Sequence, residues 1–319
     1  MIRSAAAFLV CLVAGIAVYP AVIGALAKAK AGQRIQAYGP VSHLVKAGTP
    51  TMGGVLFCLL AVIAWAVLDH TRAGFVIAFA VAAGAALGVL DDVANIRGRG
   101  ALGLLARQKL VLQGLVGVFV GVGLHNVGAT RQVLPLLGSV DLGWGVLVVA
   151  AVAVVAASNA VNLTDGVDGL AGWCSVLVFS ALWALALHLG AHSAAILSAA
   201  LVGGVLAFLV YNWWPARVFM GDTGALALGC ALATVAAEVR MLWLLPLLGV
   251  VFVAETVSVI VNVTAITRFG HRVLRASPLH HHFEELGLRE QRLVLWFGAA
   301  AGAGALLAVL AALPAGVGS

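Results

Sequence analysis

Charged residues are scarce in this sequence: Asp, Glu, Lys and Arg together make up 9% of its 319 residues, against about 25% in an ordinary soluble domain. Apolar residues make up 63%, and the mean hydropathy is +1.11. A soluble protein could not cover so much apolar surface with so few charges, which excludes a cytosolic enzyme, a disordered chain and a secreted disulfide scaffold. Because a membrane helix needs about 20 apolar residues, the composition predicts an all-α polytopic membrane protein.

Paired cysteines are also lacking. Cys11, Cys58, Cys174 and Cys230 are single, lie far apart in apolar runs and form no CxxC pair. They are therefore interpreted as small apolar residues rather than as a metal site or a disulfide set. The N-terminal apolar run, 5–27, resembles a signal peptide, but it is too long and no convincing cleavage site follows it. It is predicted to be the first membrane span.

No segment between the apolar runs is long enough to form a soluble domain, so the chain, 1–319, is predicted to be a single integral membrane domain. The apolar runs predict about ten transmembrane helices. They lie near residues 5–27, 52–68, 73–90, 110–127, 143–161, 170–189, 194–211, 223–237, 241–266 and 293–313. An even number of spans places both termini on the same side of the membrane.

Lys and Arg are distributed very unevenly over the predicted linkers. Fourteen lie in the five odd-numbered linkers and four lie on the other side. By the positive-inside rule, the odd-numbered linkers face the cytoplasm and both termini face the periplasm. The cytoplasmic linkers also carry eight acidic residues, so this face has a net charge of +6. Such a face attracts an anionic substrate or anionic lipid.

Five aspartates fall at the predicted cytoplasmic ends of three helices: Asp91, Asp92, Asp165, Asp168 and Asp222. A single acidic residue at a helix end often marks only the boundary between the membrane and water. Clustered carboxylates, however, repel one another and raise each other's pKa. A divalent cation relieves this repulsion, and oxygen-only ligands favour magnesium or manganese over zinc. The pattern predicts a metal site that is completed by substrate phosphates.

The other cytoplasmic linkers contribute groups that suit an anionic substrate. Lys46, Arg107 and Lys109 supply positive charge, and the consecutive histidines 280–282 suit a phosphate near neutral pH. Neither phosphate-loop signature, GxxxxGK(S/T) or GxGxxG, is present. Carboxylates, a metal and basic groups together are the components of phosphoryl transfer. The histidines alone would also fit a zinc site or a solvated run, and the basic segment around them would also fit binding to anionic lipid.

Seven motifs resemble the phospho-N-acetylmuramoyl-pentapeptide transferases, a branch of the polyprenyl-phosphate N-acetylhexosamine-1-phosphate transferase superfamily. The aspartate motifs are shared across the superfamily, whereas TPTMGG and PLHHHFE are much more specific to this branch. The motifs occur in the family's order as KAGTPTMGG (46–54), LDD (90–92), LLARQKL (104–110), NLTDGVDGLAG (162–172), FMGDTGALALG (219–229), FVAETVSVIV (252–261) and SPLHHHFE (277–284).

The resemblance implies a ten-helix homodimer in the bacterial inner membrane. Its implied reaction transfers phospho-N-acetylmuramoyl-pentapeptide from UDP to undecaprenyl phosphate, with Mg²⁺ as cofactor and release of UMP, to form the first lipid intermediate of peptidoglycan. The implied partners are the UDP-sugar, the lipid carrier, membrane lipids and a second copy of the chain, with no nucleic acid.

The resemblance also implies roles for individual residues. Asp222 matches the main magnesium ligand, and Asp91 and Asp92 match the paired aspartates that complete the metal site. The implied catalytic residues are Asp91, Asp92, Asp222, His280, His281 and His282. Two of the expected substrate-binding residues, Arg107 and Lys109, are the charged residues of the LLARQKL motif. The others are Lys46, Thr51, Asn162, Asp165, Gly166, Val167, Asp168 and Phe219.

Asn95 stands where the family pattern has a lysine, which removes one cation from the phosphate region. Arg97, Arg107 and Lys109 are the candidates to replace it.

Three other functions stay open at this point. A transferase of the same superfamily using UDP-N-acetylglucosamine is disfavoured by TPTMGG and PLHHHFE. An ion-coupled transporter is disfavoured because only Glu255 lies well inside a predicted span. An inactive scaffold is suggested by Asn95 alone.

Overall fold

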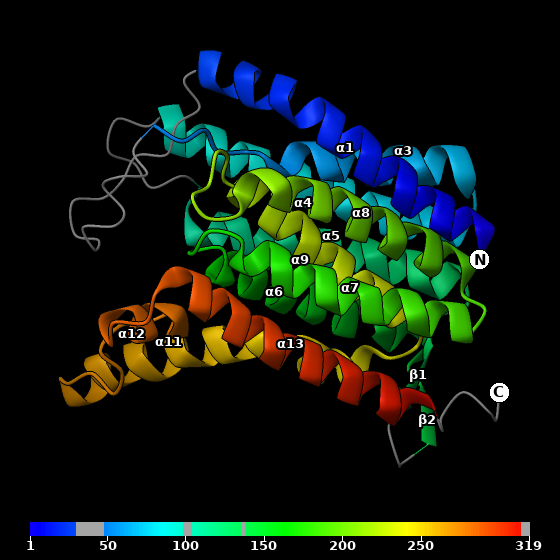
Figure 1. Cartoon of the computed structure of the whole chain (residues 1–319). Helices are drawn as coiled ribbons and strands as arrows, with labels where there is room; N and C mark the ends of the chain where they lie inside the picture. The colour runs from blue at the N-terminus through cyan, green and yellow to red at the C-terminus, as the bar shows by residue number, and fades with distance from the viewer. Residues whose placement is uncertain (30–47, 98–103, 135–137, 314–319) are drawn as a thin grey trace.

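The structure is a computed structural model that describes residues 1–29, 48–97, 104–134 and 138–313. Within these residues, ten helices of at least 15 residues form one bundle (Figure 1). Each coincides with one predicted span, so the predicted all-α polytopic fold is confirmed. They are α1 (Ile2–Lys28), α3 (Gly54–Leu68), α4 (Arg72–Arg97), α5 (Ala106–Asn126), α6 (Val146–Thr164), α7 (Leu170–His188), α8 (His192–Asn212), α9 (Gly221–Glu238), α11 (Val250–Phe269) and α13 (Glu290–Ala312).

Eight of these helices are long and apolar enough to cross a membrane, counted over the described residues. The two others are α3, which has only 15 residues, and α9, which carries Asp222 near its start and Glu238 at its end. Helix α9 lies inside the bundle, with almost every residue buried. It therefore needs less apolar character than a helix that faces lipid. The exact number of spans and the side of the termini stay predictions.

The ninth predicted helix, 241–266, starts later than its apolar run suggested. The run begins with a 3₁₀ turn, Leu242–Leu244, and the four-residue helix α10 (Leu245–Leu248), and α11 starts only at Val250. Pro246 lies in the first turn of α10, where its missing amide hydrogen is tolerated. Gly249 then separates α10 from α11. Hydropathy alone could not locate this interruption, because every residue in it is apolar.

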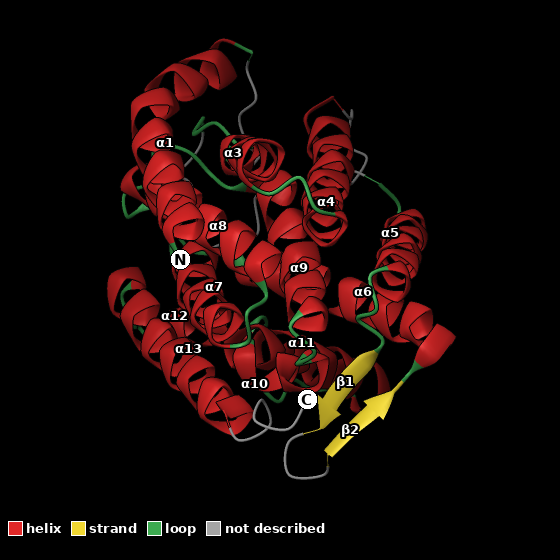
Figure 2. Cartoon of the chain, turned by 90° about the vertical axis from the view of Figure 1, so that its right-hand side faces the viewer, coloured by secondary structure: helices red, strands yellow, loops and turns green. Residues whose placement is uncertain are grey.

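A short β-hairpin, which was not predicted, joins α5 to α6 at the edge of the bundle (Figure 2). Strand β1 (Arg131–Leu134) pairs antiparallel with β2 (Gly138–Asp141). The fully buried Gln132 fastens the hairpin to the end of α9. Its Nε2 donates to the carbonyls of Ala129 and Ala237 at 3.1 and 2.9 Å, and its Oε1 accepts from the amide of Leu242 at 3.1 Å.

Helices α8 and α9 form the interior of the bundle, and the other long helices surround them (Figure 2). Small residues allow the backbones to approach closely. A Cβ at Gly203 of α8 would overlap a carbonyl of α1, and a Cβ at Gly229 of α9 would overlap the Cα of Ser158 on α6. Because lipid gives helices no hydrophobic reason to associate, such close packing is a main source of stability in a membrane bundle.

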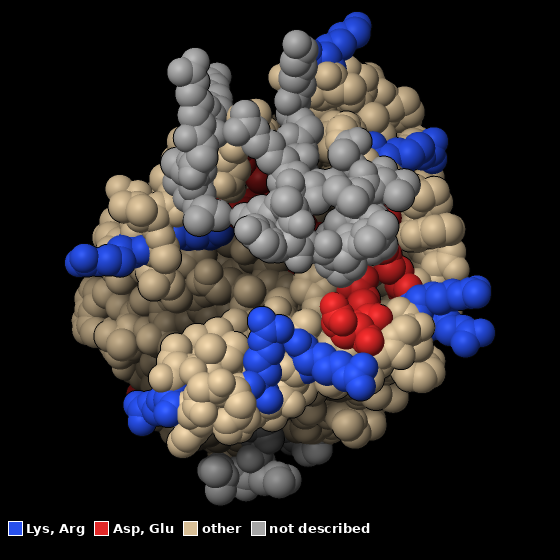
Figure 3. Space-filling view, turned by 90° about the vertical axis from the view of Figure 1, so that its left-hand side faces the viewer, with Lys and Arg blue, Asp and Glu red and all other residues tan. Residues whose placement is uncertain are grey.

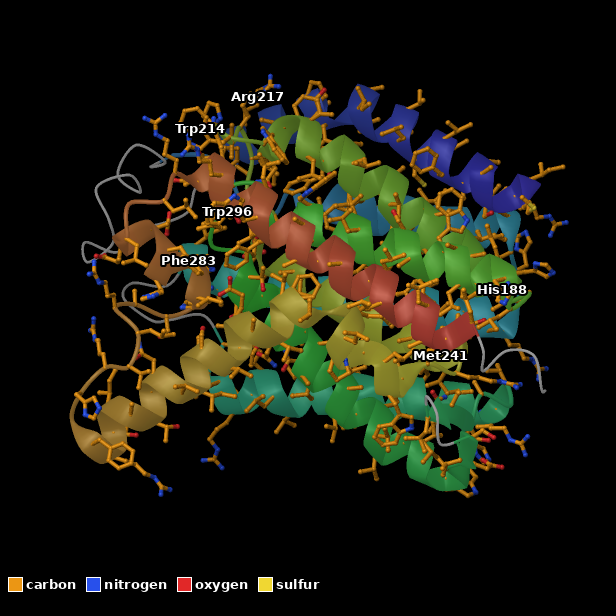
Figure 4. All side chains as sticks on the ribbon, turned by 60° about the horizontal axis from the view of Figure 1, so that its bottom comes forward. His188, Trp214, Arg217, Met241, Phe283 and Trp296 are labelled. Carbon is orange, nitrogen blue, oxygen red and sulfur yellow. The ribbon has the colours of Figure 1, made fainter. Side chains whose placement is uncertain are left out.

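The loops of the bundle lie at two opposite ends. Trp214 and Arg217, from the loop between α8 and α9, lie at the same end as Phe283 and Trp296, whereas His188 and Met241 lie at the other end (Figure 4). The start of α9 follows that first loop directly. The predicted site motifs around α9 therefore belong to the end marked by Trp214.

The contact at Gly229 generates a stability prediction. We expect Gly229→Ala to lower the free energy of unfolding by about 1–3 kcal/mol, because the added methyl group meets the α6 backbone and must push two helices apart. The measurement is thermal unfolding of the purified protein in detergent.

Gly114→Ala on α5 is the matched control, because a Cβ there has no neighbour within 4 Å. It should keep or raise the melting temperature, since alanine favours a helix by up to about 1 kcal/mol over glycine. Equal melting temperatures for the two variants would contradict the prediction.

Candidate active site

Two aspartates from different helices share one lysine at this end of the bundle. The Nζ of Lys109, in the first turn of α5, lies 2.8 Å from Oδ2 of Asp91 on α4 and 2.6 Å from Oδ2 of Asp222 on α9. Asn162 on α6 donates from Nδ2 to Oδ1 of Asp222 at 2.7 Å. Four helices thus meet at one group of polar side chains, the carboxylate cluster (Asp91, Lys109, Asn162 and Asp222).

The carboxylate cluster is largely shielded from water. The side chains of Lys109, Asp91 and Asp222 are 15%, 7% and 22% exposed. The amide of Leu104 donates to the second oxygen of Asp91 at 2.7 Å. Two shielded carboxylates without a cation would be strongly disfavoured. The ammonium group of Lys109 therefore offsets part of the cost of burying these two carboxylates.

Asp92 has a different environment from Asp91, although the two are adjacent. Its carboxylate faces the first turn of α9, where it accepts hydrogen bonds from the amides of Asp222 and Thr223 at 3.1 and 3.0 Å and from the Thr223 hydroxyl at 2.6 Å. No residue at the start of α9 caps this helix with its own side chain. Asp92 supplies that cap from α4, and its negative charge suits the positive end of the helix dipole.

The TPTMGG segment lies alongside the residues that lead into α9. The amide of Phe219 donates to the carbonyl of Pro50 at 2.8 Å, and the amide of Gly53 donates back to Phe219 at 2.8 Å. This pairing brings the hydroxyl of Thr51 close to Gly221. A Cβ on Gly221 would lie 2.8 Å from Oγ1 of Thr51 and 2.7 Å from an oxygen of Asp92, and its φ is 72°, so only glycine fits.

A second pair of segments is joined by buried side chains. Asp168, 5% exposed, accepts a hydrogen bond from the amide of Ala216 at 3.0 Å. Asn212, also buried, accepts from the amide of Gly169 at 3.0 Å and donates to the carbonyl of Val218 at 2.8 Å. Asn212 therefore holds the turn after α6 against the loop before α9. Asn212 was not predicted as a site residue. The only signal in the sequence is that it is an asparagine at the end of a long apolar run.

Asp165 lies in the same turn and faces the other carboxylates. Its burial, and the nearby charges of Asp222, Asp92 and Asp168, raise the pKa of Asp165 well above its usual range. The four acids therefore interact electrostatically although they come from three separate motifs, as the sequence predicted for a group of acids at one membrane depth.

His280 is the histidine that packs against this turn. Its side chain is 1% exposed, and a Cβ on Gly166 would overlap its Nε2. Gly166 is therefore needed for the imidazole to lie against the backbone of the turn. Val167, the next residue, is buried in the core, so its own side chain points away from solvent.

The two histidines that follow have other partners. Nδ1 of His281 lies 2.6 Å from a carboxylate oxygen of Glu284, one turn further along α12 (Leu279–Glu285). Nδ1 of His282 accepts a hydrogen bond from the amide of Arg275 at 3.2 Å. Three consecutive histidines thus contact three different parts of the chain.

Two predicted substrate-binding residues, Arg107 and Phe219, are not joined to these groups by a described side-chain contact, and Lys46 lies outside the described residues. Arg107 is exposed in the first turn of α5, two residues before Lys109. Phe219 is half-buried and takes part through its backbone. Their predicted roles in binding stay predictions.

The donor chemistry of the carboxylate cluster fits Mg²⁺ in part. Among the described residues, no group of three or more His, Cys, Asp and Glu side chains could hold a metal ion by itself. Asp91 and Asp222, however, present oxygen atoms to one shared cation, Lys109. Mg²⁺ commonly takes only one or two carboxylates and completes its shell with substrate phosphates and water. Asp91 and Asp222 could therefore supply the protein ligands of such an incomplete site.

The surface at this end of the molecule carries charges of both signs. Lys and Arg side chains surround a smaller acidic patch (Figure 3). The Lys and Arg side chains on this surface would attract an anionic substrate.

Comparisons with known proteins agree with one another. A family model described as glycosyl transferase family 4 matches residues 73–240, and the phospho-N-acetylmuramoyl-pentapeptide-transferase signature 1 matches residues 46–58. The chain is 47% identical to the phospho-N-acetylmuramoyl-pentapeptide-transferase of Moorella thermoacetica over 287 residues, which cover 88% of this chain and 90% of the relative. It is 43% identical to the enzyme of that name from Bacillus velezensis over 298 residues, 91% of each chain.

The shared cation of the carboxylate cluster can be tested without any substrate. We expect Lys109→Met to lower the free energy of unfolding by about 1.5–3 kcal/mol, because it removes two charge-assisted hydrogen bonds and leaves two carboxylates facing each other. The measurement is thermal unfolding in detergent at low and high magnesium concentration.

Millimolar Mg²⁺ should recover more stability in Lys109→Met than in the unmodified protein, because a divalent cation can then bind between the two carboxylates. Asp91→Asn in the Lys109→Met background is the control, and it should reduce this effect of Mg²⁺. A melting temperature that Mg²⁺ leaves unchanged in Lys109→Met would contradict the shared-cation interpretation.

Proposed function

The chain belongs to the family of phospho-N-acetylmuramoyl-pentapeptide transferases, and we infer that it forms the first lipid intermediate of peptidoglycan synthesis. It is a multi-pass protein of the bacterial inner membrane. We propose that its donor is UDP-N-acetylmuramoyl-pentapeptide and its acceptor undecaprenyl phosphate, with UMP as the leaving product. A phosphate oxygen of the lipid then forms a bond to the sugar-linked phosphorus, and the bond from that phosphorus to UMP breaks.

The observation that best supports this function is the shared Lys109 between Asp91 and Asp222. The reaction brings two anions together, and the second pKa of a phosphate monoester is near 6. Most of the lipid phosphate is thus already deprotonated at neutral pH, so a general base contributes less than charge neutralisation. A site that combines two carboxylates with one ammonium group suits this requirement.

We propose that Asp222, with Asp91, holds Mg²⁺ when the substrates bind. Bound there, the ion would neutralise charge on the diphosphate oxygens. Asn162 donates to Asp222 and so fixes the orientation of that carboxylate. Lys109 would contact a phosphate oxygen of the substrate. Asp92 keeps the start of α9 in place through its three hydrogen bonds.

The turn that contains Asp165, Gly166 and Asp168 is proposed to bind the nucleoside, together with Phe219. The support is its position: it is fastened to the loop before α9 by Asn212, and His280 packs against Gly166. Thr51 lies beside the start of α9 and is proposed to contact the phosphates. His281, His282, Arg107 and Lys46 are proposed to bind the remaining anionic groups.

Direct attack by the lipid phosphate is favoured over a covalent phospho-aspartate. All six carboxylate oxygens of Asp91, Asp92 and Asp222 accept hydrogen bonds in the described structure. A carboxylate oxygen that accepts a hydrogen bond is a weaker nucleophile than one that accepts none. We therefore expect no sugar-phosphoenzyme to accumulate when the enzyme is incubated with labelled UDP-sugar and no lipid acceptor. Denaturing electrophoresis of the quenched reaction checks this, and a stable labelled band would support the covalent route.

The donor sugar and the assembly state can each be tested directly. The donor sugar is tested by incubating the purified protein with undecaprenyl phosphate and one of two radiolabelled donors. These are UDP-N-acetylmuramoyl-pentapeptide and UDP-N-acetylglucosamine. We expect lipid-linked product from only the muramoyl donor. Product from only the glucosamine donor would favour the related transferase. No product from either donor would favour a scaffold or a transporter. The homodimer implied by the family is tested by the mass of the detergent-solubilised protein.

Asp222 is the residue whose replacement should affect turnover most. We expect Asp222→Asn to lower the rate of lipid-linked product formation by at least about a hundredfold at millimolar Mg²⁺, because the amide cannot supply a charged metal ligand. The measurement is the initial rate with labelled UDP-sugar, with the melting temperature recorded for the same preparation.

Asp141→Asn is the matched control, since Asp141 is an exposed aspartate of the hairpin strand β2. Its rate should stay within about twofold, as is usual for an isolated surface substitution. Substantial activity of a folded Asp222→Asn protein would refute the metal-binding role of Asp222.

A further inference from the structure

Glu255 is a buried carboxylate to which the proposed function assigns no role. It lies in the second turn of α11, inside a segment long and apolar enough to span the membrane, and its exposed fraction is 0%. An acid in such a place is costly unless it is paired. Its surroundings should therefore contain a partner that justifies its presence.

That partner is His280. The backbone amide of His280 donates to both carboxylate oxygens of Glu255, at 3.2 and 3.3 Å. The ring nitrogen Nδ1 of His280 lies 3.1 Å from Oε1. Pro278, which precedes the short helix α12, gives it no side-chain cap. Glu255 thus binds the backbone amide of the first histidine of the triplet and lies beside its ring.

The opposite edge of the imidazole faces the proposed nucleoside-binding turn. A Cβ on Gly166 would overlap Nε2 of His280, so this nitrogen lies directly against the backbone of the turn. Neither ring nitrogen of His280 has a hydrogen-bond partner among the described residues, although the side chain is 1% exposed. A buried polar atom without a partner is costly. Nδ1 has the Glu255 carboxylate 3.1 Å away, whereas Nε2 lies against the turn that is proposed to bind the nucleoside.

We propose that Glu255 is a positioning residue for His280. A carboxylate beside Nδ1 favours the tautomer with its proton on that nitrogen, as carboxylates do for catalytic and metal-binding histidines. Nε2 is then held towards the turn, in the orientation needed to contact the substrate. The inference rests on the proposed function, because it assigns His280 a contact with the substrate of that reaction.

A purely structural role for Glu255 has a different consequence. If the carboxylate only caps α12, its contribution goes through the backbone amide of His280 and does not need the imidazole. Replacing Glu255 would then lower stability, and it would lower activity by the same factor whether residue 280 is histidine or not. If Glu255 acts through the imidazole, its replacement should have no further effect on the rate once the imidazole is gone.

The experiment is a double-mutant cycle of Glu255→Gln and His280→Asn, with kcat, KM for the UDP-sugar and melting temperature measured for each protein. Glutamine keeps an acceptor for the backbone amide but loses the charge. We expect Glu255→Gln to lower kcat by about tenfold or more with KM within about twofold, and His280→Asn to lower kcat at least as much. The double variant should be no slower than His280→Asn.

Glu238→Gln, at the other end of α9, is the matched control for loss of a partly buried glutamate and should keep its rate. Glu255→Asp is a second variant that keeps the charge but withdraws it by one methylene. It should lower kcat with little change in melting temperature, so the proposal can be tested even if Glu255→Gln folds poorly.

The outcomes separate the inference from the proposed function. Losses that multiply in the double variant, or full activity of Glu255→Gln and Glu255→Asp, would overturn the positioning role while leaving the transferase function intact. Full activity of His280→Asn would remove the contact with substrate on which the inference depends. No transfer by the unmodified protein would overturn both.

Discussion

Pairing of charge in an apolar molecule is the constraint on which this structure depends. Few charged residues are available, and several at the Trp214 end of the bundle are shared between helices. Lys109 joins α5 to α4 and α9, Asp92 caps α9 from α4, and Glu255 of α11 holds the start of α12. Each contact satisfies a group that would be costly to bury alone. The same contacts fix the relative positions of helices whose apolar surfaces would otherwise let them slide in lipid.

Close backbone packing allows these short side chains to reach their partners. A Cβ at Gly88 of α4 would overlap the backbone of Asp222, and one at Gly54 of α3 would overlap the backbone of Gly224. Helices α3 and α4 therefore touch the first turn of α9 directly. An aspartate reaches only a few ångströms from its own backbone, so Asp92 could not cap α9 if larger residues separated the two helices. The glycines at these contacts thus serve the site as well as the packing.

The sequence predicted the ten helices, because an apolar run of membrane length leaves a helix few alternatives, and it predicted which motifs share one end. It could not distinguish Asp91 from Asp92. Adjacent residues on a helix point in directions about 100° apart, and which one meets α9 depends on how the helices are rotated. The role of Asn212 and the late start of α11 were missed for a related reason. Both are set by contacts with distant segments rather than by local composition.

Asn95 lies on the same helix as Asp91 of the carboxylate cluster. It is exposed on α4, one turn beyond Asp91, where a lysine would interact mainly with acids of its own helix. Lys109 comes instead from α5 and contacts Asp91 and Asp222 together. The loss of a cation at residue 95 therefore leaves the charge balance of the cluster unchanged: two carboxylates and one ammonium group, with a net charge of −1. A divalent cation bound there would neutralise that residual negative charge. An asparagine at residue 95 is thus compatible with a working phosphoryl-transfer site.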